Sequence, residues 1–387
     1  MRSEYYAVLP FWESPYIPFK GAVPIPEDVA KERIHLQLDY DDRNRVTAAH
    51  VKIGMHYKEF EGRFGNLYIN APLTRITYHG NKETHTFFDR FNNQIQVQGN
   101  IYTKVYEKDE RGRNVKLTFW DEEGNVAVDW YGNATYDWIH EPDGSIIEER
   151  RNPEGEITPL RGQFQFLRTR MTFGYDGYFS LLQNIDGQGQ LVNAECGAST
   201  LRYFYDGQGR FLRWEVYDKN GNKATGPSHT SGEENTFYEY DLQDIIFFDG
   251  EGNPAMHWSG CERWHFDIDQ FGNRISLIHQ DRNGKPMNAS RGYAETKMNF
   301  SDDGRFLLSQ SHFDSDGEHT IHRDYGYHKI EYIRDQSGLI LSINYLGTDG
   351  TPVERKDSGI STIKNEWDNN QKFIKSTAYD LSGKLIK

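Results

Sequence analysis

A turn of the form Asp-x-x-Gly, or close to it, recurs along most of this sequence at nearly constant spacing, and no other feature limits the fold as strongly. Its last residue falls at Asn92, Gly124, Gly155, Gly189, Gly221, Gly252, Gly284, Gly317, Gly350 and Gly383. A second series of turns lies out of phase with the first, at Gly80, Gly112, Gly144, Gly177, Gly209, Asp241, Gly272, Gly304, Gly338 and Asn370. A third series ends a longer connection, at Gly99, Gly132, Gly162, Gly197, Gly232, Gly260, Gly292, Gly326 and Gly359. Three interleaved series that share a period of about 32 residues identify a tandem repeat.

Between the turns, polar and apolar residues alternate as they do in β-strands. In one such stretch the polar set is Arg263, His265 and Asp267, and the apolar set is Trp264, Phe266 and Ile268. An alternation of period two places the apolar side chains on one buried face. In each turn the aspartate accepts backbone N–H groups and the glycine takes a positive φ. Each repeat is therefore predicted to be a hairpin followed by a longer connection, such as 284–292.

We predict an all-β protein of about ten tandem β-hairpin repeats, which stack because one hairpin cannot bury its apolar face alone. The array is expected to be a barrel-like or spiral antiparallel enclosure, and a wide barrel, an open spiral and a propeller all remain open. Residues 41–387 are predicted to form this single array. Residues 1–40 are predicted to be a cap or plug, because the aromatic and proline-rich stretch 11–19 suits the cover of an open strand edge. Only 26–34 carries helix signals.

The segment GASTLRYFYDGQGRFLRWEVYDKNGN (197–222) resembles the YD (Rhs-type) repeat, whose core pattern is Tyr-Asp-x-x-Gly-Arg-Leu. The longer unit at 265–295 is similar to a long-period relative of that repeat, and the resemblance covers about residues 85–387. In the family, such repeats wind into hairpin spirals that can enclose a hollow shell. The resemblance implies architecture only, because YD-type repeats carry no catalytic motif of their own.

Composition restricts the partners of the chain. The net charge is −14, and an acidic surface repels phosphate backbones and anionic lipids, so nucleic acid and membrane are not expected as partners. No apolar run suits a signal peptide or a membrane span, which predicts a soluble cytoplasmic protein. Cys196 and Cys261 lie about two repeats apart, roughly 19 Å along the array at strand spacing, whereas a disulfide needs Cα atoms within about 7 Å. We expect free thiols.

The long connections should emerge together on one edge of the array, where functional residues usually concentrate. The longest of them, 221–235, breaks the repeat pattern, and such exceptions are where functional sites are expected. His229 is predicted to be a general base that Glu233 orients, and Glu195 in an earlier connection could share that role. The structural alternative is a solvated loop whose polar side chains cap their own backbone.

A second candidate is the stretch MHWSGCERWHF (256–266). His257, Cys261 and His265 are four residues apart and would share one face of an extended strand. They could form a Cys–His nucleophile pair or a metal set, although no Cys-x-x-Cys or His-Glu-x-x-His motif supports a metal. Buried packing is the alternative. The histidines of 312–329 allow only a weak metal site, so we predict no metal and no cofactor.

Substrate-binding groups are predicted in the same connections. Arg161, with Arg168 and Arg170 nearby, would bind a carboxylate or phosphate, or else form cross-strand ion pairs. Trp130 and Trp258 would stack on sugar rings, or else belong to the core. Asp129 completes the set of polar groups on this edge.

Two functions follow from these residues. The first is a redox-neutral enzyme that performs a cyclisation, isomerisation, elimination or hydrolysis on a small or oligomeric polar substrate, in a pocket on the long-loop edge. Its catalytic residues would be His229, His257, Glu195 and Glu233, and its substrate-binding residues Arg161, Asp129, Trp130, Trp258 and Cys261. The alternative is a non-catalytic scaffold that binds or encapsulates a glycan, a peptide or a protein. The partner is thus a small molecule or oligosaccharide, or a protein.

Overall fold

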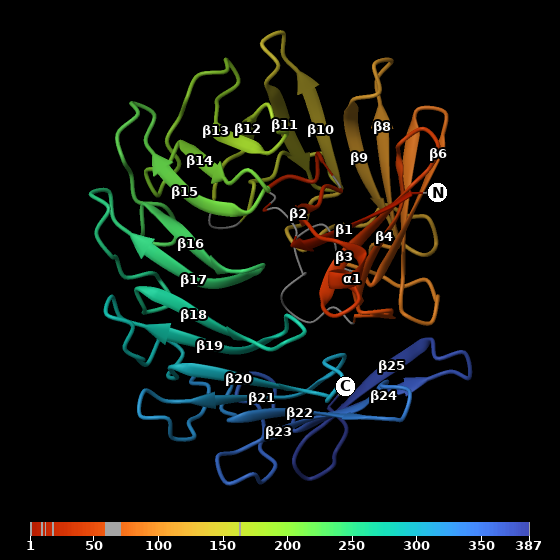
Figure 1. The fold of residues 1–387 in the computed structure, drawn as a ribbon, viewed down its shortest axis with the longest axis vertical. Coiled ribbons are helices and arrows are strands. Elements are labelled where there is room, and N and C mark those ends of the chain that lie inside the picture. The colour runs from red at the N-terminus through yellow and green to blue at the C-terminus, as the bar shows by residue number, and fades with distance from the viewer. Residues whose placement is uncertain are drawn as a thin grey trace. The chain divides into compact units, whose positions relative to one another are not determined.

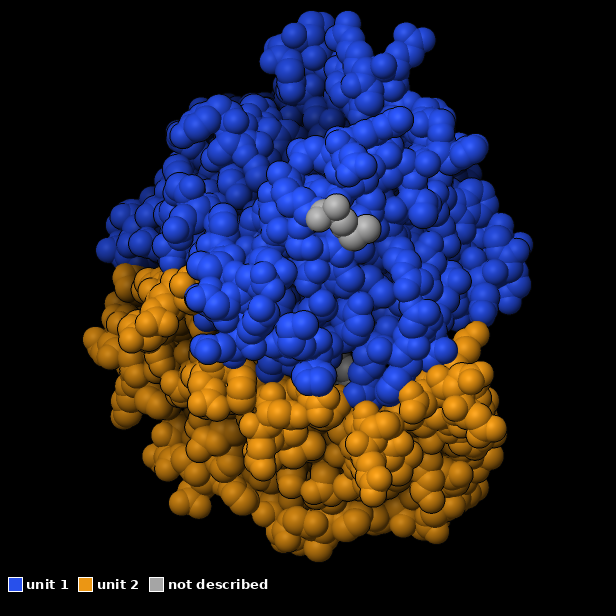
Figure 2. All heavy atoms as spheres, turned by 45° about the vertical axis from the view of Figure 1, so that its right-hand side comes forward, with its two compact units in different colours: residues 1–235, 248–253 blue, residues 236–247, 254–387 orange. Residues whose placement is uncertain are grey.

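A computed structural model describes residues 2–8, 11, 13–17, 19–58, 71–161 and 164–386. These residues form 25 β-strands and one short helix (Figure 1), so the predicted all-β hairpin array is confirmed. No helix among them is long and apolar enough to cross a membrane. The chain divides into two compact units, which Figure 2 colours separately. Unit 1 comprises residues 1–235 and 248–253, and unit 2 comprises residues 236–247 and 254–387.

Unit 1 contains the first fifteen strands and the helix. They are β1 (Arg2–Val8), β2 (Ala22–Pro24), α1 (Glu27–Ala30), β3 (Ile34–Tyr40), β4 (Val46–Ile53), β5 (His56–Tyr57), β6 (Leu73–His79), β7 (Lys82–Phe88), β8 (Thr103–Lys108), β9 (Asn114–Trp120), β10 (Thr135–His140), β11 (Ile146–Arg151), β12 (Arg168–Phe173), β13 (Phe179–Asn184), β14 (Thr200–Tyr205) and β15 (Phe211–Tyr217). The helix is a single turn, shorter than the predicted 26–34, because the chain enters β3 at Ile34.

The chain enters unit 2 within β16 (Gly232–Tyr238). All of β17 (Asp241–Phe248) except its last residue belongs to unit 2, and residues 248–253 belong to unit 1. The remaining strands belong wholly to unit 2. They are β18 (Arg263–Ile268), β19 (Arg274–Gln280), β20 (Glu295–Phe300), β21 (Leu307–Phe313), β22 (Lys329–Arg334), β23 (Ile340–Leu346), β24 (Thr362–Trp367) and β25 (Phe373–Tyr379).

The hairpins follow the predicted turn chemistry. In β18–β19, residues pair antiparallel from Arg263↔Gln280 to Ile268↔Arg274, with a register shift beside the turn. The Asp269 Oδ1 atom accepts the N–H groups of Phe271 and Asn273 at 2.9 and 2.8 Å, and Gly272 has a φ of 88°. The aspartate satisfies the donors of the turn and the glycine tolerates its left-handed backbone.

Pairing runs from each hairpin to the next without closure. In unit 1, β1 pairs with β2 and β3, and in unit 2, β25 pairs with β24. No pairing joins the first and last strands of either unit in the residues that the structure describes. Each unit is therefore an open hairpin array, and the closed-barrel alternative is wrong for both.

Most repeats also bury one residue whose carbonyl accepts the N–H group of the residue eight positions later, and we call these positions the core column. In unit 1 the core column contains Phe87, Phe119, Arg150, Asn184 and Val216, and in unit 2 it contains Phe247, His279, His312 and Tyr345. Because these residues hold equivalent places, the core column compares the interiors of the two units.

Candidate functional site

Several of the predicted site residues lie in the turn that ends a long connection. In that turn the N–H group of the fourth residue donates to the carbonyl of the first, at distances of 2.8 to 3.0 Å. The pairs are Asp129–Gly132, Ala194–Gly197 and Gly226–His229 in unit 1, and His257–Gly260 and Ala289–Gly292 in unit 2. Asp129 and His257 thus hold the first position of the turn, and Trp130, Glu195 and Trp258 the second. His229 takes the glycine position with a φ of 66°, so Gly232 is not the equivalent glycine. Gly162 lies outside the described residues.

Neither His229 nor Glu195 occupies a buried site. Both residues are exposed, and the Ser228 and Thr230 hydroxyls beside His229 hydrogen-bond each other at 2.8 Å. Asp129 caps its own turn, because its Oδ1 atom accepts the N–H groups of Tyr131 and Asn133. Trp130 is 63% exposed. These four residues therefore have local backbone or surface roles in the structure, and their predicted functional roles stay predictions.

The His257 region of unit 2 is packed rather than open. The ring of His257 stacks on Phe247 with centroids 4.2 Å apart, and its Nδ1 atom lies 2.7 Å from the Ser259 hydroxyl. That hydroxyl lies 3.3 Å from the Sγ atom of Cys261, which is fully buried. Burial raises the pKa of the Cys261 thiol, and a thiol is a poor nucleophile in that form. His265 instead contacts Asp244 at 2.7 Å, so the three residues form no metal set.

The two cysteines and the other side chains that could bind a metal form neither a disulfide nor a metal site in the described chain. Cys196 and Cys261 are free thiols, as predicted. Within the described ranges, no three His, Cys, Asp or Glu side chains gather as a metal site. Trp258 remains partly exposed, and its backbone carbonyl accepts the Ser290 hydroxyl at 3.0 Å.

Two predicted residues, Arg161 and Glu233, belong to one cluster in unit 1 together with Glu13. Arg161 Nη2 lies 2.5 Å from Oε1 of Glu13, a residue that is only 2% exposed. The Arg161 guanidinium also lies over the Phe164 ring, 5.0 Å from its centroid. Burial raises the pKa of Glu233 to about 7, against the opposing effects of a Trp214 hydrogen bond and the Arg161 charge. Burial likewise raises the pKa of Glu13. Nothing in the local sequence pairs Glu13 with a residue 148 positions away.

A second buried charge pair lies on β11. Arg150 Nη1 lies 2.5 Å from Glu148 Oε1, and both side chains are fully buried. Glu148 Oε2 accepts hydrogen bonds from Trp138 Nε1 at 2.8 Å and from the hydroxyl of Ser14. Arg150 donates onward to the carbonyl of Phe166 at 2.7 Å. Ser14 thereby joins a strand ion pair that would otherwise lack one of its donors.

Glu13 and Ser14 belong to a segment whose described residues, 11, 13–17 and 19–20, lie against the strands of unit 1. Side chains of the array donate to its backbone carbonyls: Tyr205 to Phe11 at 3.3 Å, Tyr106 to Pro15 at 3.1 Å and Asn114 to Tyr16 at 2.8 Å. The Phe11 ring stacks on Phe211 at 4.6 Å, and the Tyr16 ring meets Trp138 edge-on at 5.3 Å. We call the side chains of Tyr106, Asn114, Glu148, Arg161 and Tyr205 the segment seat.

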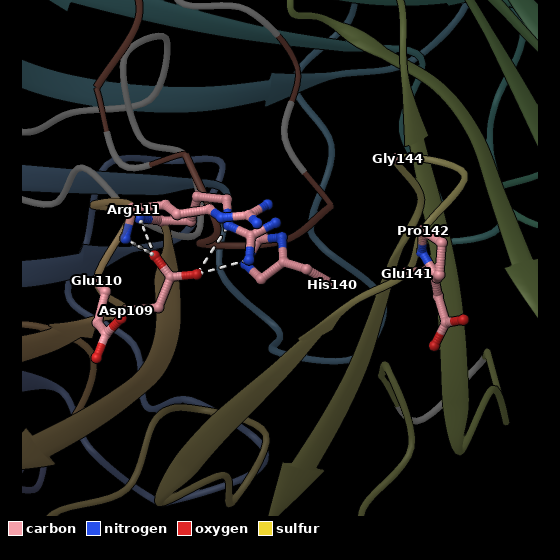
Figure 3. A pocket seen from close by; sticks show the side chains of 8 residues that line it. Asp109, Glu110, Arg111, His140, Glu141, Pro142 and Gly144 are labelled. Carbon is pink, nitrogen blue, oxygen red and sulfur yellow. Dashed lines mark hydrogen bonds and ion pairs between the residues drawn. The ribbon is translucent and has the colours of Figure 1, made fainter.

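Beside Tyr16 lies a cavity of about 620 Å³, drawn in Figure 3. It is lined by Asp109, Glu110, Arg111, Arg113, His140, Glu141, Pro142 and Gly144. Arg113 pairs with Asp109 at 2.7 Å, and His140 Nε2 donates to the Asn114 carbonyl at 2.9 Å. The cavity adjoins the second-series turns at Gly112 and Gly144, at the opposite strand ends from the long connections. The pocket expected on the long-loop edge therefore stays a prediction.

Comparison with known protein families gave no match, and comparison with curated proteins gave none. Solved structures similar to this chain include the crystal structure of TcdB2-TccC3-TEV, at 9% identity with a TM-score of 0.27. They also include the Photorhabdus luminescens Tc holotoxin pore, at 11% identity with a TM-score of 0.21. Each of these two alignments covers 91% of this chain and 21% of the other, so this chain spans 21% of their length. A porin-like protein from Bacteroides uniformis aligns at 10% identity with a TM-score of 0.22, over 55% of this chain and 86% of its own.

Proposed function

We propose that this protein is a non-catalytic binding scaffold, a long-period YD-type hairpin array that holds an extended polypeptide segment against its strands. One observation carries the proposal: side chains from separate hairpins of unit 1 converge on residues 11 and 13–16. Tyr106 comes from β8, Glu148 from β11 and Tyr205 from β14, and each contacts the same segment. A repeat array is suited to this work because stacked units present an extended surface.

The contacts favour a peptide over the glycan that the sequence also allowed. The bound segment offers carbonyl groups to tyrosine and asparagine donors, and a carboxylate to Arg161. Tyrosine supplies a large contact surface and a hydroxyl at little conformational cost, which is why it is common in protein-binding surfaces. On this proposal residues 1–40 include a plug that unit 1 retains.

The retention of the segment can be tested by thiol labelling. Ser14→Cys in a Cys196→Ser background should react with a thiol reagent at least a hundredfold more slowly than Ser358→Cys in the same background. Ser14 is fully buried and Ser358 is exposed, and the remaining native thiol, Cys261, is buried in both. Equal labelling rates in folded protein would mean that the segment is not held, and the proposal would be abandoned.

The enzyme hypothesis has one observation in its favour, which is the pKa of Glu233. A carboxyl whose pKa is about 7 can donate and accept protons near neutral pH, and Arg161 beside it could fix an anionic substrate. We would screen organic acids and oligosaccharides for thermal shifts and turnover, with Glu233→Gln beside the wild type. Turnover that Glu233→Gln abolishes, with its melting temperature kept, would establish the enzyme. A thermal shift with peptides alone would support the scaffold.

A further inference from the structure

We infer that the segment seat is a recognition site for an extended peptide of another protein chain. That peptide carries an aromatic residue, then a glutamate and a serine two and three positions later, followed by a proline and a tyrosine. The inference rests on the proposed function and adds a partner to it. The protein's own residues 11 and 13–16 occupy the seat in this structure and define the chemistry that it accepts.

The seat fixes the path of the bound backbone through side chains. The Tyr205, Tyr106 and Asn114 side chains each donate to a carbonyl of the segment, at 3.3, 3.1 and 2.8 Å. Every residue has a carbonyl, so these donors require an extended path and not a particular sequence. One of the carbonyls belongs to Pro15, which has no N–H group to satisfy, so a proline suits that place.

The charged members of the seat supply the selectivity. Arg161 contacts the Glu13 carboxylate, and the buried Glu148 accepts the Ser14 hydroxyl. A buried charge that loses a partner is strongly unfavourable. A peptide without the glutamate and the serine would therefore be rejected even if its aromatic residues fitted.

The segment is held in a way that permits exchange. Residues 13–17 belong to no strand, and the structure gives residues 14–17 no backbone–backbone hydrogen bond to the array. Their hold on unit 1 consists of side-chain hydrogen bonds, an ion pair and ring contacts, all of which a free peptide can reproduce. A tethered segment has an effective concentration in the millimolar range, so a free peptide competes poorly until the tethered one is weakened.

The test uses a fluorescein-labelled peptide of sequence FWESPYIPFK, which is residues 11–20, and the full chain. Phe11→Ala with Tyr16→Ala removes the two aromatic anchors of the tethered segment and leaves every residue of the seat intact. By fluorescence anisotropy, this double variant should bind the peptide at least tenfold more tightly than the wild type does. Phe373→Ala, at an exposed position on β25, is the matched control and should behave as the wild type. Adding Arg161→Ala to the double variant should weaken binding at least tenfold.

Three results would overturn the inference. The first is equal binding of FWESPYIPFK and a scrambled peptide by a folded double variant. The second is binding that Arg161→Ala leaves unchanged. The third is a concentration-dependent dimer of the double variant that the peptide dissociates, which would assign the seat to a second copy of this chain. If the double variant does not fold, Ser14→Ala takes its place with the same thresholds. Slow labelling at position 14 without peptide binding would leave the scaffold standing and remove only the partner.

Discussion

Unit 1 and unit 2 use the same hairpin but fill the core column differently. In unit 1 the column runs through Phe87, Phe119, Arg150, Asn184 and Val216, beside a hydrophobic cluster that includes Leu117, Met171, Leu182 and Leu201. In unit 2 it runs through Phe247, His279, His312 and Tyr345, and His257, His322 and His328 are buried as well. Because turns and backbone pairing define the repeat, the buried residues of its interior can change without a change of fold.

The two units therefore bury different kinds of ionisable groups. Unit 1 buries the carboxyls of Glu13 and Glu148 against arginines. Unit 2 buries neutral imidazoles: His312 Nδ1 lies 3.1 Å from the Thr296 hydroxyl, and its ring stacks on Tyr293 at 4.3 Å. This contrast predicts that the two units respond differently to substitutions of buried residues and to changes of pH.

The largest expected effect is on the buried ion pair of unit 1. Arg150→Met keeps the bulk at that position of the core column but leaves Glu148 charged, buried and without its partner. We expect a loss of about 3–5 kcal/mol in the free energy of unfolding, measured by denaturant titration. His312→Met at the equivalent position in unit 2 should cost only about 1 kcal/mol, because it removes a neutral hydrogen bond. Equal losses would show that the contrast between the cores has no energetic meaning.

Acid should open unit 2 before unit 1. Burial lowers the pKa of His279 to about 4 and that of His312 to about 3, from 6.5, and the positive Arg291 disfavours protonation of both. Burial also lowers the pKa values of His322, beside Arg355 and Asp324, and of His328, beside His319 and Lys329. Since these folded values lie below 6.5, the stabilisation is complete above pH 6.5 and is lost as pH falls toward 3. At pH 4 the loss should be on the order of 2–3 kcal/mol for His312 alone.

Hydrogen exchange at pH 7 and pH 4 measures this loss unit by unit. Amides of β19–β23 should lose protection at pH 4, and His312→Phe should reduce that loss, whereas the exposed His229→Phe should not. Unit 1 also buries His35 and His85, and burial lowers the pKa of both, but Glu83 lies 2.7 Å from the His85 ring and opposes the shift of that pKa. Earlier loss of protection in β8–β15 would contradict the expected order.

The third effect is a loss of stability in unit 1 as pH rises, which is opposite to the effect of acid on unit 2. The pKa of Glu233 is about 7 in the folded protein, above its ordinary 4.5, so its stabilising effect is present below pH 4.5 and is lost as pH rises through 7. Glu233→Gln removes the titration and should stabilise the protein by about 1–3 kcal/mol at pH 8 relative to the wild type, with little effect at pH 5. Thermal melts at both pH values provide the comparison. Equal effects at pH 5 and pH 8 would show that the carboxyl is ionised throughout.

The smallest effect concerns His229, at the position that glycine holds in the other long connections. Its φ of 66° disfavours a side chain, so His229→Gly should stabilise the protein by about 0.5–1 kcal/mol. His229→Ala, which keeps the strain, should have little effect and serves as the control. A loss of stability on His229→Gly would mean that the imidazole makes a contact that outweighs the backbone strain.

Sequence reasoning succeeded where a few neighbouring residues decide the structure. The Asp269 turn was predicted from its spacing and is present, because a carboxylate reaches the N–H groups two and four residues later whatever the rest of the chain does. It failed where one residue replaces another in the same role. The third glycine series was assigned to Gly232 in the connection 221–235, and the structure places His229 at the glycine position of that turn instead.

In the candidate site, likewise, some residues were predicted from the sequence and others were missed. Arg161 and Glu233 were selected as charged residues of the long connections, and they do belong to one cluster. Its third member, Glu13, was missed, because it enters from a segment that carries no repeat. His257 and Cys261 were selected by their spacing, but whether they face a cavity or a packed ring depends on Phe247, which comes from another strand.

The sequence by itself determined the period, the turns and the hairpins, because those depend on hydrogen bonds between residues a few positions apart and on alternation along single strands. Only the tertiary structure decided which charges are buried together and what the interior of each unit is made of. Ion pairs such as Arg161–Glu13 depend on which distant segments meet, and the cost of burying a charge depends on surroundings that no single repeat contains.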